Sequence, residues 1–145
     1  MRRAVFDSTI LVSAFISRRG GLSHELLDLA RKGEFELVIS TAILLETFRT
    51  LIDNAELRRQ YRYSEDRAYR YCRGLHRIAA QVWLGTSPRS GIVRDPADDH
   101  VVACAIDARA DTIVSRDKDL LSLGSYRAIS IITPEAFRQQ LRDEQ

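Results

Sequence analysis

Short apolar runs alternate along the chain with longer segments whose apolar residues recur at helical spacing. Five runs have the length and composition of β-strands: residues 3–6, 35–39, 82–84, 112–115 and 129–132. Because strands and helices alternate, the pattern predicts a mainly parallel sheet covered by helices on both faces. We therefore expect one three-layer α/β/α domain that spans residues 1–145.

The helical segments follow residues that commonly occupy the N-cap position. We expect N-caps at Ser23, Ser40, Ser64, Asp95 and Thr133. Proline directly after the fourth of these fits the first position of a helix. Residues 10–16 form a further helical or turn segment, Gly33 is expected to end the helix that begins near residue 23, and residues 85–91 are expected to form a flexible loop.

Acidic residues follow the strands or begin the helices after them. Asp7 follows the first strand, Glu46 lies early in the helix after the second, Asp98 and Asp99 open a later helix, and Asp117 follows the fourth strand. Open parallel sheets bind ligands beyond the carboxyl ends of their strands. Carboxylates that converge there repel one another unless they take up protons or cations, and oxygen ligands suit Mg²⁺ or Mn²⁺. The sequence therefore predicts a divalent-metal site.

Each acid also has a structural interpretation as a turn, cap or solvent-facing residue. Asp95 is interpreted as a helix cap, because Asp-Pro at a helix start explains it. Asp98 can act in capping or as a ligand, whereas Asp99 has no evident local role and is preferred for the metal. Asp117 is preferred over Asp119 because it lies nearer the strand end. Asp98 and Asp119 remain additional candidates.

Hydroxyl and basic residues supply further candidates. Three hydroxyls beside the acids are candidates to hydrogen-bond a ligand or a phosphate oxygen, although such residues are commonly turn or cap residues: Ser8, Thr9 and Ser115. Five basic residues are candidates for contacts with an RNA backbone, although the first three equally fit a solvated helix face: Arg70, Arg73, Arg77, Arg116 and Lys118.

Composition narrows the class of protein. The chain has 145 residues and a net charge of +2, and 20 of its 22 basic residues are arginine, which alone is weak evidence for nucleic-acid binding. No apolar run approaches the roughly 18 residues of a membrane span, so we expect a cytoplasmic protein that does not contact membranes. The two cysteines are interpreted as buried small residues rather than a disulfide or zinc ligands.

The order and spacing of four segments resemble a PIN domain, most closely the branch described as toxin components of toxin-antitoxin systems. The segments are residues 5–14, residues 35–46, residues 94–99 and residues 115–121. The resemblance extends from about residue 3 to residue 141. It differs from the family at two positions, with Thr9 where Asn is frequent and His100 where Lys is frequent in this branch.

The resemblance implies a PIN-like fold and an endoribonuclease that depends on Mg²⁺ or Mn²⁺. It implies that the catalytic, metal-binding acids are Asp7, Glu46, Asp99 and Asp117. In such an enzyme the metal polarises the scissile phosphate and lowers the pKa of a bound water. The resemblance also implies an RNA substrate, a cognate antitoxin protein and a homodimer.

Three alternatives compete with a nuclease. A haloacid-dehalogenase phosphatase requires a second Asp two residues after the first, where this chain has Thr9. A receiver domain requires paired acids after the first strand and a lone acceptor Asp in mid-chain, which this sequence lacks. The strongest alternative is a catalytically silent PIN-like module that binds RNA or a partner. The presence of all four acids argues against it, and a nuclease assay with and without EDTA separates the two.

Overall fold

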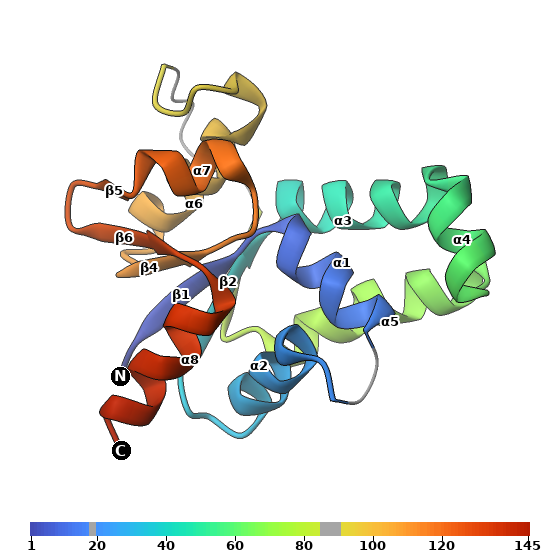
Figure 1. The fold of residues 1–145 in the computed structure, drawn as a ribbon, viewed down its shortest axis with the longest axis horizontal. Coiled ribbons are helices and arrows are strands. Elements are labelled where there is room, and N and C mark those ends of the chain that lie inside the picture. Colours follow the sequence, from blue (N-terminus) through green and yellow to red (C-terminus); the bar gives the residue numbers. More distant parts are fainter. Residues whose placement is uncertain (18–19, 85–90) are drawn as a thin grey trace.

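The protein is built around a six-stranded sheet, seen in a computed structural model whose described residues are 1–17, 20–84 and 91–145 (Figure 1). The strands are β1 (Arg3–Phe6), β2 (Glu36–Ser40), β3 (Gln81–Trp83), β4 (Thr112–Val114), β5 (Ser125–Tyr126) and β6 (Ile129–Ile132). Their order across the sheet is β3-β2-β1-β4-β6-β5. All neighbours are parallel except β5 and β6, which are antiparallel.

The described residues form nine helical segments, most of which pack around this sheet. They are α1 (Ser8–Ile16), α2 (Leu22–Arg31), α3 (Thr41–Asp53), α4 (Ala55–Tyr61), α5 (Glu65–Ile78), the 3-10 helix η1 (Pro96–Asp98), α6 (Asp99–Asp107), α7 (Lys118–Leu123) and α8 (Pro134–Asp143). Helix α6 contacts β1, β2 and β4, while α2 and α8 pack together on the opposite face (Figure 1). The predicted α/β class with a mostly parallel sheet flanked by helices is confirmed.

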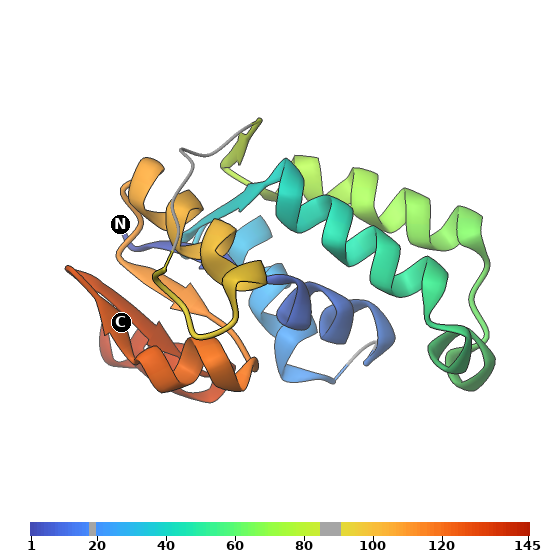
Figure 2. The same ribbon diagram turned by 90° about the horizontal axis from the view of Figure 1, so that it is seen from above.

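Helices α3 and α5 lie side by side and extend away from the sheet, with α4 joining them at the far end (Figures 1 and 2). No helix in the described part of the chain combines the length and apolar character needed to cross a membrane.

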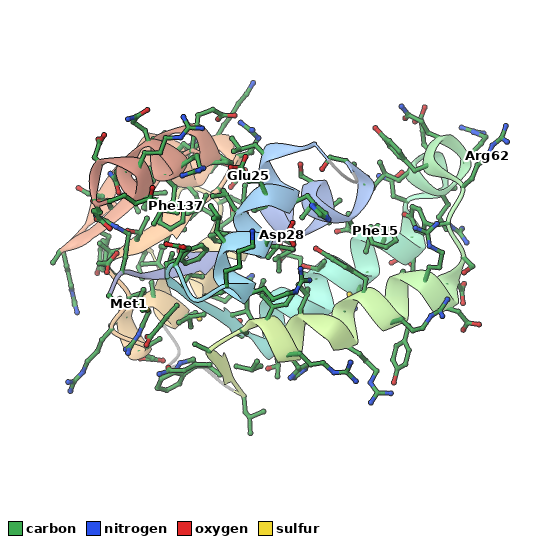
Figure 3. The ribbon with its side chains drawn as sticks, turned by 90° about the horizontal axis from the view of Figure 1, so that it is seen from below. Met1, Phe15, Glu25, Asp28, Arg62 and Phe137 are labelled. Atoms are coloured by element: carbon green, nitrogen blue, oxygen red, sulfur yellow. The ribbon has the colours of Figure 1, made fainter. Side chains whose placement is uncertain are left out.

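Two aromatic clusters mark the two parts of the core. Under the sheet, Phe137 of α8 meets the rings of Phe6 and Phe35, with centroids 5.9 and 4.9 Å away. Between α1, α3 and α5, Phe15 packs on Tyr63 and Tyr71, with both centroids 4.9 Å away. Figure 3 shows Phe137 on the sheet side of the molecule and Phe15 on the side of the α3–α5 extension. Helix α1, which begins directly after β1, is thus held between both parts of the core.

The predicted capping residues explain most helix starts. Ser40 accepts the backbone N–H of Ile43 at 3.1 Å, and Ser64, Asp95 and Thr133 make equivalent bonds, as predicted. The prediction for Ser23 is wrong: the N-cap of α2 is Gly21, two residues earlier, and Ser23 is buried within the first turn of the helix.

Three elements of the structure were not predicted from the sequence. Helix α4 buries no residue, and α7 and β5 are too short for a periodic signal to develop. Helix α6 is also preceded by the short helix η1, so Asp-Pro opens a 3-10 turn rather than the α-helix itself. Most of the predicted loop at residues 85–91 lies outside the described residues.

Candidate metal site

The pairing of β1 with β4 sets two polar residues next to each other at the carboxyl edge of the sheet. Phe6 is in register with Val114, so Asp7 and Ser115 are the first residues beyond these strands. Asp7 is 3% exposed and caps α1. Its Oδ1 accepts the Thr9 hydroxyl at 2.6 Å and the Ile10 N–H at 3.3 Å, and its Oδ2 accepts the Ser115 hydroxyl. These bonds fix the orientation of the carboxyl group.

Burial makes the Asp7 carboxylate expensive to ionise. Loss of hydration raises the pKa of Asp7 to about 6, and the nearby charge of Asp117 acts in the same direction. The bonds from Ser115, Thr9 and Ile10 oppose that rise without cancelling it. Without a cation, this carboxyl group therefore holds a proton more tightly than an ordinary aspartate.

Asp117 lies directly before α7, facing the same region. Its side chain makes no capping bond, while its backbone N–H donates to the Ser115 Oγ at 2.9 Å. Its Oδ2 is buried and has no hydrogen-bond partner in the described chain. A buried acceptor without a donor is costly. A bound cation would satisfy this oxygen.

Asp98, the last residue of η1, completes the group. Burial is the largest cause that raises its pKa to about 7, followed by a hydrogen bond with Asp117 and by the charges of Asp117, Asp95 and Glu46. Two carboxyl groups can share a hydrogen bond only when one of them carries a proton. The structure therefore brings four carboxyl groups into one electrostatically linked set: Asp7, Glu46, Asp98 and Asp117.

Asp98 and Asp99 have local environments opposite to those expected from the sequence. Asp99 is buried, and its Oδ1 accepts the Val93 N–H at 2.7 Å, so the premise that it lacks a local role is wrong. Asp98 makes no side-chain capping bond. Asp95 is the cap, as predicted, accepting the Ala97 N–H at 3.0 Å.

Glu46 lies on α3 between a hydroxyl and an imidazole. Ser8 donates to its Oε1 at 2.5 Å, and the His100 Nε2 lies 3.0 Å from its Oε2. The bond with His100 is the main cause that lowers the pKa of Glu46, the Ser8 bond acts in the same direction, and burial opposes both. Glu46 therefore ionises more readily than an ordinary glutamate, whereas Asp7 and Asp98 hold their protons more tightly than ordinary aspartates.

A second acidic group adjoins the first. Asp95, Asp98 and Asp119 each place one carboxylate oxygen within 4.8 Å of the others, a spacing that can hold a cation. Asp119 is also paired with Arg94 at 2.6 Å. Asp98 therefore belongs to both groups, which makes it the carboxylate that connects them.

Comparison with known proteins assigns the chain that carries these carboxylates to a family. The sequence matches the PIN domain family over residues 3–119, most of its length. The chain belongs to the PIN domain family. PIN domains are generally metal-dependent nucleases, which agrees with a cluster of carboxylates suited to a divalent ion.

A solved structure supports the same fold. The crystal structure of PAE2754 from Pyrobaculum aerophilum is similar, with a TM-score of 0.54 and 15% sequence identity. The likeness covers 98% of this chain and 90% of that one. No curated protein matches the sequence.

The basic residues nominated from the sequence lie in two places on this PIN domain. Arg116 is occupied by a two-bond contact with Glu135, at 2.9 and 2.6 Å, whereas Lys118 is exposed at the start of α7. The other three, here called the α5 basic flank, are exposed on α5: Arg70, Arg73 and Arg77. Helices α5 and α7 lie apart in both ribbon views, whereas α5 packs against α3, the helix that carries Glu46 (Figures 1 and 2).

Sequence reasoning did not assign a role to His100. Its contact with Glu46 joins α6 to α3, and its Nδ1 is buried without a partner in the described residues. The available signal was its position directly after Asp98 and Asp99, at a site where the resembling branch often carries lysine.

Proposed function

We propose that this PIN domain is a divalent-metal-dependent endoribonuclease that hydrolyses phosphodiester bonds of RNA with Mg²⁺ or Mn²⁺. The observation that carries the proposal is the linked set of carboxyl groups. Its members include a buried, partnerless oxygen of Asp117 and two acids, Asp7 and Asp98, whose pKa values rise to about 6 and about 7. Without a cation, Asp7 and Asp98 hold protons more tightly than ordinary aspartates, and a divalent ion can replace these protons.

The residues that would hold the ion are Asp7, Glu46, Asp98 and Asp117. Asp98 takes the place that the family resemblance gave to Asp99, because Asp98 contacts Asp117 while Asp99 binds a backbone amide. When bound, the ion would polarise the scissile phosphate and lower the pKa of an attacking water.

The surrounding hydroxyls orient these carboxylates. Ser115 and Thr9 hold both oxygens of Asp7, and Ser8 holds one oxygen of Glu46. Because each hydroxyl also lies on a strand end or in the first turn of α1, the backbone fixes the positions of the donors. This arrangement pre-organises the ligands, as supporting contacts do in metal sites generally.

The finer biological role rests on family resemblance. We propose that the protein is the toxin of a toxin-antitoxin pair, that it acts as a homodimer, and that a cognate antitoxin protein inhibits it. Cleavage of RNA by an uninhibited toxin would arrest growth. Co-expression with the product of an adjacent short reading frame, and rescue of growth by that product, tests this role.

A cleavage assay tests the proposed activity. Purified protein is incubated with end-labelled single-stranded RNA in Mg²⁺, Mn²⁺ or EDTA, beside Asp117→Asn and the control Glu34→Gln, at an exposed position before β2. We expect metal-dependent internal cleavage by the wild type and the control, and at least a hundredfold loss in Asp117→Asn. RNA binding without cleavage in either metal would instead support the silent-module alternative.

A further inference from the structure

A groove of about 790 Å³ runs along α3 and joins the candidate metal site to the beginning of α4. Glu46 and His100 line the groove where it meets the carboxylates, and Asn54 and Ala55 line its other end. The groove is open to solvent and continuous with one of the proposed ligands. A chain bound at the metal site can therefore continue along α3.

One face of α3 forms the wall of this groove. Glu46, Arg49 and Asp53 all line it, at a spacing of three and seven residues that places them on the same side of a helix. With a rise of about 1.5 Å per residue, Arg49 lies roughly 4.5 Å further along the axis than Glu46. Arg49 and Glu46 are therefore less than one helical turn apart along α3.

Arg49 is exposed and forms no ion pair with any described residue. Two arginines close in sequence to the other acids, by contrast, form ion pairs. Arg94 is paired with Asp119 and Arg116 with Glu135. A guanidinium without a carboxylate partner retains its full capacity to bind a phosphate through two parallel N–H bonds.

We propose that Arg49 binds the phosphate next to the scissile one, so that the groove along α3 seats a single RNA strand. This inference rests on the proposed ribonuclease function. Asp53 lies further along the groove, and its negative charge disfavours a second phosphate there. The groove therefore offers one arginine–phosphate contact. Leu45, which also lines the groove and is 47% exposed, offers apolar surface to an unpaired base.

The experiment compares Arg49→Ala with Arg49→Lys and with Arg59→Ala, an exposed arginine of α4 outside the groove. Single-turnover cleavage of a single-stranded RNA is followed at increasing protein concentration and at several salt concentrations. For Arg49→Ala we expect the half-saturating concentration to rise roughly tenfold, with less than a twofold change in the maximal rate. The slope of log affinity against log salt should fall by about 0.7, the value for one single-strand phosphate.

The controls distinguish this contact from a general charge effect. Arg49→Lys should keep the salt slope, and Arg59→Ala should behave as the wild type. Equal losses in Arg49→Ala and Arg59→Ala, or an unchanged slope in Arg49→Ala, would overturn the inference while leaving the ribonuclease function intact. If the wild type binds RNA without cleaving it, the same series measured by fluorescence anisotropy decides the role of Arg49 separately from catalysis. A duplex RNA bound as tightly as the single strand also contradicts the proposal.

Discussion

Replacing Asp7 by Asn should stabilise the metal-free protein, and the gain should depend on pH. The pKa of Asp7 rises from 3.8 to about 6 on folding, mainly because the carboxyl group is buried. The native state therefore keeps its proton at pH values where the unfolded chain has released it. For such a group stability falls as pH rises between about 4 and 6, and the full penalty persists above that range.

The size of the penalty follows from the same shift. A rise of roughly two units corresponds to about 3 kcal/mol above pH 6. Asparagine removes the charge, remains a good N-cap and can still accept the Ile10 N–H. Its amide must donate to the Ser115 hydroxyl, which reorients, so we expect a net gain nearer 2 kcal/mol at pH 8 and below about 0.6 kcal/mol at pH 4.

Urea denaturation in EDTA at the two pH values measures this difference, with Asp53→Asn as the exposed control. The control should change stability by less than about 0.5 kcal/mol at either pH. The melting temperature of Asp7→Asn should rise by about 5 °C at pH 8. A variant that is less stable than the wild type at pH 8 would refute the reasoning, because Asp7 would then be a structural residue.

Three further predictions concern the site, the core and the basic surface. Asp98→Asn should lose at least a hundredfold in single-turnover rate with Mn²⁺. Asp99→Asn should lose less than tenfold, because its side chain still accepts the Val93 N–H. The reverse order of losses would return the ligand role to Asp99. Phe137→Ala should lower the free energy of unfolding, measured in urea, by about 3–5 kcal/mol, because the ring is fully buried against two other rings. A loss under about 1 kcal/mol would contradict the described packing. Changing all three arginines of the α5 basic flank to Gln should leave melting nearly unchanged, and a fall of up to about two in the salt slope of RNA binding would show that the substrate also crosses α5.

The sequence predicted the fold well where hydrophobic periodicity and capping chemistry agree. Residues 4–6 of the first strand are fully buried, and Ser40 and Ser64 supply capping oxygens, so these boundaries follow from local chemistry. Helix α4 could not be predicted because it buries no residue. The antiparallel pairing of β5 with β6 depends on tertiary context that two residues do not encode.

The candidate site was predictable to the level of its acidic segments but not of its individual contacts. That Asp7 and Asp117 lie near each other follows from parallel strands and from their positions after β1 and β4. The choice between Asp98 and Asp99 depends on the short 3-10 turn, which rotates one side chain toward Asp117 and the other toward the Val93 backbone. The contact of His100 with Glu46 joins residues on two helices, and no local pattern signals it.

The most direct test of the central claim is calorimetric titration of the protein with Mn²⁺ at pH 6, repeated in buffers of different ionisation enthalpy. If the linked carboxyl groups hold the ion, binding should be saturable and should release about one proton, because Asp7 and Asp98 retain protons near this pH. Asp117→Asn should weaken binding at least tenfold, while Asp119→Asn should leave it within about twofold. Binding without proton release, and with equal losses in the two variants, would contradict the account.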